Sequence, residues 1–253
     1  MIVITGLAAE ARIAAGPGIR TLAGGGHAKR LEANLRLAVA QGGRSILSFG
    51  IAGGLAPNLR PGSWLVARSV IDGASRIATD SDWSARLAEL IPDAEIVDVI
   101  GVDTPIGNPA EKRATHQATG AGIADMESHI AARVALAHRL PFAVCRVVAD
   151  PAERSLPPAA LVGMRTDGSV DAAAVLYSLI RKPRQLPALV RLARDTQTAF
   201  RALFSGREVL GPSFGSADFG EFVLDVPRKD EFGRALAVER DLGRHPTLGA
   251  QTS

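Results

Sequence analysis

The chain has 253 residues, 47% of them hydrophobic and 22% charged, and its 29 basic and 26 acidic residues give a formal net charge of +3. This composition predicts a globular protein with room for one substantial domain, and the small positive charge excludes a strongly basic nucleic-acid-binding protein. The single cysteine, Cys145, excludes an internal disulfide, and no Cys and His residues have the spacing of a metal site.

Short apolar segments alternate with segments of helical periodicity over the first 150 residues. In chain order the pattern predicts a strand at 2–5, a helix at 7–15, a glycine-rich loop at 16–27, a helix at 28–41, a strand at 46–49, a glycine turn at 50–54, strands at 64–67 and 69–71, a helix at 82–91, a strand at 96–100, a helix at 109–118, a strand at 123–125, a helix at 127–139 and a strand at 142–149. This alternation predicts an α/β fold in which helices cover both faces of a mixed sheet.

Two further helices are predicted at 170–181 and 186–204. The second has an apolar stripe at helical spacing, with Arg191, Arg194 and Arg201 off the stripe. Two interpretations stay open: a terminal helix packed on the sheet, and a basic amphipathic face that docks on a membrane. The stripe consists of Leu186, Leu189, Val190, Ala193, Phe200, Leu203 and Phe204.

The C-terminal segment differs in character from the rest of the chain. It is rich in glycine and in charged residues, yet it holds four phenylalanines, Phe214, Phe219, Phe222 and Phe232. We therefore predict a domain at 1–210 and a weakly ordered extension at 211–253.

The N-terminal residues Met-Ile-Val-Ile-Thr-Gly have the pattern of a strand that enters a turn, not of a signal peptide. No apolar run is long enough to span a bilayer. We expect a cytoplasmic protein, with peripheral membrane contact as the open alternative.

Four residues suited to binding or catalysis lie at or just past predicted strand ends: Glu10, Gly53, Glu127 and Asp150. Because ligands collect at the carboxyl ends of strands in such sheets, we expect these residues to converge on one cavity. Met126 and Glu127 are a poor pair for a core, whereas a carboxylate is well suited to bind a sugar hydroxyl. Ordinary structural roles stay open: a surface position for Glu10, a helix terminus for Glu127 and a turn for Asp150.

Three separated motifs carry a resemblance to a known family: Gly53-Gly54-Leu55, Asp125-Met126-Glu127-Ser128 and Arg146-Val147-Val148-Ala149-Asp150. In this order they resemble the nucleoside phosphorylase superfamily over residues 1–205, and more narrowly the methylthioadenosine/S-adenosylhomocysteine nucleosidases. The second motif and Ala110-Glu111-Lys112 look like the hopanoid-associated phosphorylase branch, which is thought to remove adenine from adenosylhopane. The resemblance implies a three-layer sandwich and a homo-oligomer.

The resemblance also implies roles for the carboxylates. Asp150 matches the acid that protonates N7 of the departing adenine, a role that needs a pKa raised by desolvation. Glu127 matches the residue that accepts hydrogen bonds from the ribose hydroxyls and stabilises the positive charge that develops on the sugar. Glu10 matches the base that activates water in the nucleosidases.

The remaining site residues would bind substrate. Met126 would lie against the ribose face as a soft apolar surface. Gly53 and Gly54 would let backbone N–H groups approach a phosphate or a nucleophilic water. Ile106 belongs to the segment that corresponds to the base-binding strand of the family.

The sequence departs from the family pattern at residues that would contact the nucleophile and at a residue that would contact the nucleobase. Ile51 stands where the family often has Ser or Thr, and Ser48 stands where one phosphorylase branch has Arg. Pro105 replaces an aromatic residue beside the base, which makes a bulky non-standard nucleoside more plausible. Four residues are candidates to replace the phosphate clamp: Arg12, Lys29, Arg30 and Arg68.

We therefore interpret the chain as an enzyme that cleaves the N-glycosidic bond of an adenine nucleoside, with adenosylhopane as the favoured substrate. Water and phosphate stay open as the nucleophile, and no organic cofactor or metal is expected. The alternatives are a methylthioadenosine/S-adenosylhomocysteine nucleosidase and a nucleoside-binding module without catalysis.

Overall fold

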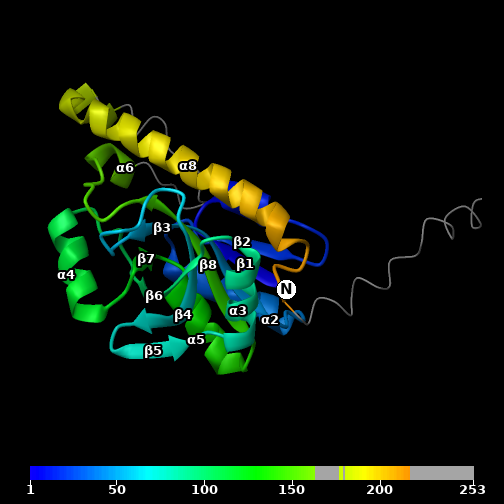
Figure 1. Cartoon of the computed structure of the whole chain (residues 1–253). Helices are drawn as coiled ribbons and strands as arrows, with labels where there is room; N and C mark the ends of the chain where they lie inside the picture. Colours follow the sequence, from blue (N-terminus) through cyan, green and yellow to red (C-terminus); the bar gives the residue numbers. More distant parts are fainter. Residues whose placement is uncertain (163–176, 179, 217–253) are drawn as a thin grey trace, which may run out of the picture. The chain divides into compact units, whose positions relative to one another are not determined.

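The structure, a computed structural model, describes residues 1–162, 177–178 and 180–216, and Figure 1 shows the arrangement of their elements. In chain order these are β1 (Ile2–Thr5), α1 (Ala8–Ala14), β2 (Arg20–Ala23), α2 (Ala28–Ala40), β3 (Ile46–Gly54), β4 (Trp64–Asp72), β5 (Ser75–Ala78), α3 (Ser81–Leu90), β6 (Glu95–Gly101), α4 (Pro109–Thr119), β7 (Ile123–Asp125), α5 (Ser128–His138), β8 (Phe142–Asp150), α6 (Pro158–Val162), the 3-10 helix η1 (Pro183–Gln185) and α8 (Leu186–Leu210).

Most predicted elements are confirmed, and the main corrections concern strands, although the short helices α6 and η1 were not predicted either. Strand β2 occupies part of the predicted loop at 16–27, and β5 has no counterpart among the predictions. The stretch 50–54 continues β3 and is not a turn. Glycine is unfavourable in an isolated strand, but pairing of these residues with β7 and β8 outweighs that preference. The helix predicted at 170–181 lies largely outside the described residues.

The strands form a mixed sheet that closes on itself over part of its length. Strand β3 pairs in parallel with β1 and β8, and its last residues pair antiparallel with β7. Strand β8 pairs antiparallel with β4, β4 pairs in parallel with β6, and β6 pairs in parallel with β7. The predicted mixed sheet is therefore confirmed, and its closure brings the ends of β3, β7 and β8 together.

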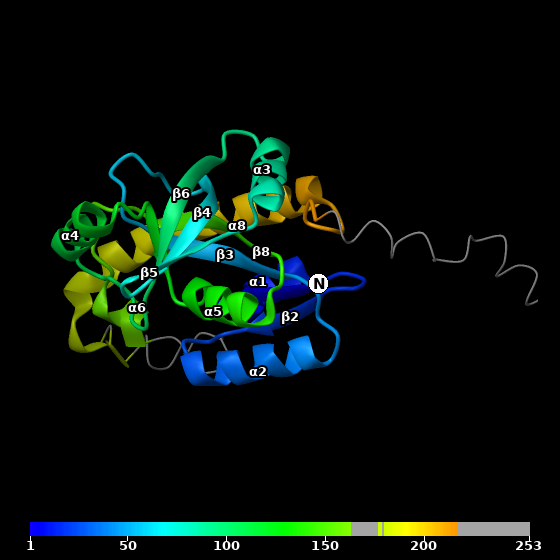
Figure 2. The ribbon, with the colours of Figure 1, turned by 90° about the horizontal axis from the view of Figure 1, so that it is seen from below.

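Helices cover both faces of this sheet, as the three-layer prediction requires. Figure 2 shows α2 and α5 on one side and α3 and α8 on the other. On the first face Leu35 and Ile130 pack into one core, and on the second face Trp83 and Leu203 pack into another. Because strand residues alternate between the two faces, the central strands are apolar along almost their whole length.

Helix α8 packs on β8, which confirms the first of the two interpretations of this segment. Leu186, Val190 and Phe204, all part of the predicted stripe, are nevertheless exposed. The buried face includes Leu203 of that stripe together with Ala199, Gly206 and Leu210. No helix in the described part of the chain is long and apolar enough to cross a membrane.

The residues just after α8 pack against the domain, although the sequence assigned them to the extension. Phe214 is fully buried, and its ring lies 5.1 Å from the ring of Phe49. Trp83 Nε1 donates a hydrogen bond to the carbonyl of Phe214 at 2.7 Å. The compact unit therefore runs to Ser216. The rest of the predicted extension, residues 217–253, lies outside the described residues.

The contact of α8 with β4 gives a stability prediction. A Cβ on Gly206 would stand only 2.1 Å from Cζ2 of Trp64. Gly206→Ala should therefore destabilise the protein by about 1–3 kcal/mol through overpacking, although alanine favours helix formation by about 1 kcal/mol. Urea unfolding measures the change, with the exposed neighbour Ser205→Ala as the control. A Gly206→Ala variant as stable as the control would show that this contact does not set the position of α8.

Candidate active site

Three strands meet at Gly53. In the register of the sheet Gly53 pairs with Ala124 of β7 on one side and with Asp150 of β8 on the other. The motif that follows Ala124 and the carboxylate that ends β8 therefore flank the same glycine. This is the convergence that their positions at strand ends predicted.

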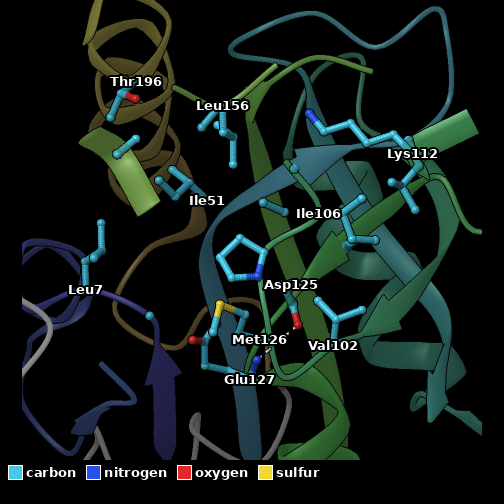
Figure 3. A pocket seen from close by; sticks show the side chains of 18 of the residues that line it. Leu7, Ile51, Val102, Ile106, Lys112, Asp125, Met126, Glu127, Leu156 and Thr196 are labelled. Atoms are coloured by element: carbon cyan, nitrogen blue, oxygen red, sulfur yellow. Dashed lines mark hydrogen bonds between the residues drawn. The ribbon is translucent and has the colours of Figure 1, made fainter. Parts of the chain in front are cut away.

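A cavity of about 280 Å³ opens at this edge of the sheet, and Figure 3 shows side chains that line it. Its lining includes five of the seven predicted site residues: Glu10, Gly53, Ile106, Met126 and Glu127. Gly54 and Asp150 are not among the described residues that line it. Asp150 lies just behind Gly53, where a Cβ would stand 3.3 Å from its Oδ1. The seven residues lie together, and their roles stay a prediction.

Main-chain hydrogen bonds from two elements hold Glu10. Its Oε2 accepts from the N–H of Leu7 at 2.8 Å, and its Oε1 accepts from the N–H of Ile51 at 2.8 Å. Gly50, with a φ of +144°, makes room, because a Cβ there would stand 2.7 Å from the carboxylate. Glu10 is 1% exposed, so the surface role left open by the sequence is excluded.

Glu127 is buried at the start of α5 between two glycines. A Cβ on Gly6 would stand 3.2 Å from Oε1, and a Cβ on Gly24 would stand 3.1 Å from Cγ. The side chain makes no capping hydrogen bond to α5 and lines the cavity instead. The helix-terminal role therefore does not account for this glutamate.

Arg146 holds the carboxylates together, and our sequence reasoning gave it no role. Its guanidinium is fully buried on β8, where Nη2 donates to Ser48 Oγ at 2.7 Å and to Glu127 Oε2 at 3.3 Å. Nη1 donates to the carbonyl of Ile51 at 3.3 Å, and Nε lies 2.9 Å from Asp125 Oδ2. An arginine inside an otherwise apolar strand segment was the signal that could have identified it.

Asp125 anchors the start of α5. Its Oδ1 accepts from the N–H groups of Glu127 at 3.2 Å and Ser128 at 2.8 Å, and its Oδ2 accepts from Ser128 Oγ. Ser128 Oγ also lies 2.9 Å from Ser48 Oγ, within hydrogen-bond distance. These bonds fix the main chain of residues 126–128 and with it the direction of the Glu127 side chain.

The crowding and burial of these carboxylates change their proton affinity. Burial raises the pKa of Glu127 to about 7, with Asp125 and Glu10 adding to the rise and Arg146 opposing it. Burial also raises the pKa of Glu10, against the effects of Arg146 and of the main-chain N–H groups that it accepts from. Both groups therefore keep their protons to higher pH than ordinary glutamates do.

Asp150 pairs with Lys112, a residue that was not among the predicted site residues. Lys112 Nζ donates to Asp150 Oδ2 and to the carbonyl of Pro151 at 3.0 Å. Burial raises the pKa of Asp150, and the ammonium of Lys112 opposes that rise. In Figure 3 Lys112 and Glu127 lie at opposite ends of the cavity.

Elsewhere the cavity wall is mainly apolar. The loop after β6 contributes Val102, Pro105 and Ile106. The other part is made by the N-cap of α1, by β3, by α8 and by the segment that precedes α6, which contribute Leu7, Ile51, Leu192 and Leu156 in that order. The described lining residues include no aromatic side chain, in keeping with Pro105 in the sequence.

The charges around the cavity are mostly negative. Three carboxylates, from Glu10, Asp125 and Glu127, line it, and Lys112 is the one basic residue among its described lining residues. The candidate replacements for a phosphate clamp, Arg12, Lys29, Arg30 and Arg68, are outside that lining. Within the described ranges, no group of three or more His, Cys, Asp or Glu residues is arranged to hold a metal ion.

A family model of the phosphorylase superfamily matches residues 19–181. The chain belongs to the phosphorylase superfamily. It is accordingly a nucleoside phosphorylase or nucleosidase, an enzyme that cleaves N-glycosidic bonds. Comparison with curated proteins gave no match.

Solved structures with the same fold include nucleosidases. The Helicobacter pylori futalosine hydrolase has 16% sequence identity and a TM-score of 0.53, over 72% of this chain and 97% of that one. A 5′-methylthioadenosine/S-adenosylhomocysteine nucleosidase from Helicobacter pylori has 14% identity and a TM-score of 0.54, over 82% and 97%. The corresponding nucleosidase from S. pneumoniae has 13% identity and a TM-score of 0.55, over 83% and 98%. At this identity the likeness establishes the shared fold.

The raised pKa of Glu127 predicts the pH dependence of a Glu127→Gln variant. A carboxyl whose pKa is higher in the folded state stabilises the protein most below its unfolded value, and this contribution is lost as pH rises through about 7. Glutamine has no such dependence, so the stability of Glu127→Gln relative to wild type should increase between about pH 5 and about pH 8. Thermal melting at several pH values measures this.

The exposed residue Glu89 gives a control, since Glu89→Gln should show a constant stability difference over the same range. Glu127→Gln should also lose about a hundredfold or more in turnover of a nucleoside. A stability difference that stays flat for Glu127→Gln would show that its carboxyl is not desolvated as described.

Proposed function

We propose that this enzyme hydrolyses the N-glycosidic bond of an adenine nucleoside that carries a large apolar 5′ substituent, with adenosylhopane of hopanoid biosynthesis as the favoured substrate. The proposal rests on one observation above all. The buried carboxylates of Glu10 and Glu127 line a cavity of nucleoside size whose other walls are mainly apolar, and the carboxylate of Asp150 lies beside Gly53 of that lining.

In this mechanism each carboxyl group acts on a different part of the substrate. Glu127 accepts hydrogen bonds from the ribose hydroxyls and stabilises the positive charge that develops as the C1′–N9 bond breaks. The electron pair of that bond moves into the adenine ring, and Asp150 donates a proton to N7. Glu10 accepts a proton from the water that attacks C1′. Ribose with a free 1′-hydroxyl and neutral adenine are the products.

Charge favours water over phosphate as the nucleophile. Glu10 already accepts hydrogen bonds from Leu7 and Ile51, and its remaining lone pairs can accept one from water. A phosphate dianion in the same place would face the carboxylates of Glu10 and Glu127 at short range and in a poorly solvated site. The cationic group of Arg146 is already engaged with Asp125 and Glu127.

The apolar wall supports a large 5′ substituent. Leu7, Ile51, Leu156 and Leu192 contribute carbon surface and no charge. A hydrophobic group buried there gains about 25 cal/mol per Å² of apolar area removed from water. Pro105 in place of an aromatic residue reduces stacking on the base, so binding would depend more on the 5′ group.

A methylthioadenosine/S-adenosylhomocysteine nucleosidase is the second candidate, because solved nucleosidases of that kind share the fold. Both candidates would use the same carboxylates and would differ in the 5′ group. A module that binds nucleosides without cleaving them is the third possibility, and the assay below distinguishes it.

The test measures free adenine from a series of 5′-substituted adenosines, each with and without inorganic phosphate. We expect the fastest release from an apolar, lipid-linked adenosine, at equal rates in both buffers. Glu10→Gln should lower the rate by about a hundredfold or more, because it removes the base. Release that requires phosphate would instead make the enzyme a phosphorylase. Preference for methylthioadenosine would favour the second candidate, and binding without release would favour the third.

We also propose that a cytoplasmic form of this enzyme contacts an anionic membrane through the segment around η1. Exposed apolar residues lie there beside exposed cations, and the sequence from 177 to 194 contains no acidic residue. The apolar residues are Tyr177, Ile180, Leu186 and Val190, and the cations are Arg181, Lys182, Arg184, Arg191 and Arg194. Such a surface matches the charge and the apolar interior of an anionic membrane.

Vesicle sedimentation tests this contact. The protein should sediment with phosphatidylglycerol vesicles more than with phosphatidylcholine vesicles, and added salt should weaken the binding. Leu186→Ser combined with Val190→Ser should reduce it, whereas Phe204→Ser, at the other end of α8, should not. Equal sedimentation with both lipids, or with neither, would contradict the proposal. A homo-oligomer stays a prediction that the same purified protein can test by light scattering.

A further inference from the structure

Helix α4 contains one fully buried side chain, and that side chain is a lysine. Lys112 is 1% exposed, whereas its neighbours Glu111 and Arg113 are exposed. A helix normally packs through an apolar face. Burial of an ammonium group is costly, and an apolar residue of similar volume often gives equal or greater stability. A purely structural role therefore does not explain why lysine occupies this position.

Three hydrogen bonds use all three protons of the Lys112 ammonium. Nζ donates to Oδ2 of Asp150, to the carbonyl of Pro151 at 3.0 Å and to the carbonyl of Arg154 at 3.3 Å. The lysine thus joins α4 to the end of β8 and to the segment that follows it. The same segment is fixed on its other side by an ion pair between Arg154 and Asp195 of α8.

This lysine leaves one oxygen of Asp150 for other partners. Oδ2 is engaged by the ammonium, and a Cβ on Gly53, which lines the cavity, would stand 3.3 Å from Oδ1 and 3.6 Å from Oδ2. The segment after β8 and the loop before α4 are joined as well, since Leu156 N–H donates to the carbonyl of Gly107 at 2.9 Å. The base end of the cavity is therefore built around the Lys112–Asp150 pair.

We propose that Lys112 is a positioning residue for base departure: its ammonium orients Asp150 so that Oδ1 faces the purine, and it stabilises the carboxylate that remains after Asp150 donates its proton. This inference rests on the proposed function of Asp150 as the acid. The step is balanced. The C1′–N9 bond breaks, its electron pair enters the purine, the proton of Asp150 moves to N7, and Asp150 is left as an anion beside the ammonium.

Burial and the ammonium of Lys112 have opposite effects on the pKa of Asp150. Burial raises its pKa, which keeps the proton available, and Lys112 lowers it, which makes the proton easier to transfer. Other charged groups near this end belong to the segment 151–156, to α8 and to the cluster across the cavity: Glu153, Arg154, Asp195, Glu10, Asp125, Glu127 and Arg146. Arg154 and Asp195 neutralise each other, and Arg146 is engaged with the carboxylates of its own cluster.

The test compares the pH profile of base release for wild type, Lys112→Met and Lys112→Gln. Without the ammonium the pKa of Asp150 should rise, so the alkaline limb, where Asp150 loses its proton, should move to higher pH in both variants. Base release near neutral pH should fall about tenfold to a hundredfold. Lys112→Gln should retain more activity than Lys112→Met, because an amide can still donate to Oδ2.

Arg113→Met is the matched control, since it removes an exposed cation from the next position of the same helix. It should leave the profile unchanged. A second readout uses 4-nitrophenyl riboside, whose leaving group departs without protonation. Lys112→Met should lose less activity with this substrate than with an adenine nucleoside.

Two results would overturn the role of Lys112. One is a pH profile of both Lys112 variants that coincides with that of wild type. The other is an equal loss with both substrates accompanied by a lower melting temperature, which would indicate a structural role only. These results differ from failure of the proposed function, in which wild type itself releases no base from any nucleoside.

Discussion

A single buried guanidinium organises this site. Arg146 contacts Asp125 and Glu127, donates to Ser48, and reaches the main chain of β3 at Ile51. Burial raises the pKa of Glu10 and of Glu127, and the positive charge of Arg146 opposes that rise in both. The arginine is in turn held by the strands around it, since β8 lies between β3 and β4. The site therefore depends on the closed part of the sheet, and the closed part carries the charge that the site requires.

Glycines provide the space that these carboxylates occupy. Gly6 and Gly24 adjoin Glu127, Gly50 adjoins Glu10, and Gly53 adjoins Asp150. At each of these positions a Cβ would lie between 2.7 and 3.3 Å from the acidic side chain, close enough to displace it or to force a shift. The glycines of β3 thus do not form the turn that the sequence predicted. They are strand residues that allow acidic side chains to pack against the backbone.

The cavity has two chemically different ends. At one end, carboxylates gather around Arg146 near the position that the resemblance assigns to the sugar. At the other end, Asp150 is paired with Lys112, and the wall between the two ends is mainly apolar. This division matches the needs of glycosidic cleavage, in which positive charge develops on the sugar while the departing base gains a proton. In the mechanism that we propose, this ion pair makes the proton donor, Asp150, depend on helix α4.

The sequence by itself determined the alternation of elements, the mixed α/β class and a set of candidate site residues, five of which line one cavity. These depend on local periodicity and on the direction of strands, both of which can be read along the chain. The sequence did not determine that 50–54 is a strand, that β2 exists, that Phe214 belongs to the core, or that Arg146 and Lys112 are the partners of the acidic residues. Each of these depends on groups far apart in the chain. Pairing with two neighbouring strands outweighs the low preference of glycine for strands, and the distant residues Phe49 and Trp83 bury Phe214. A buried cation is stable only where carboxylates from other elements surround it. Tertiary structure alone brings those groups together.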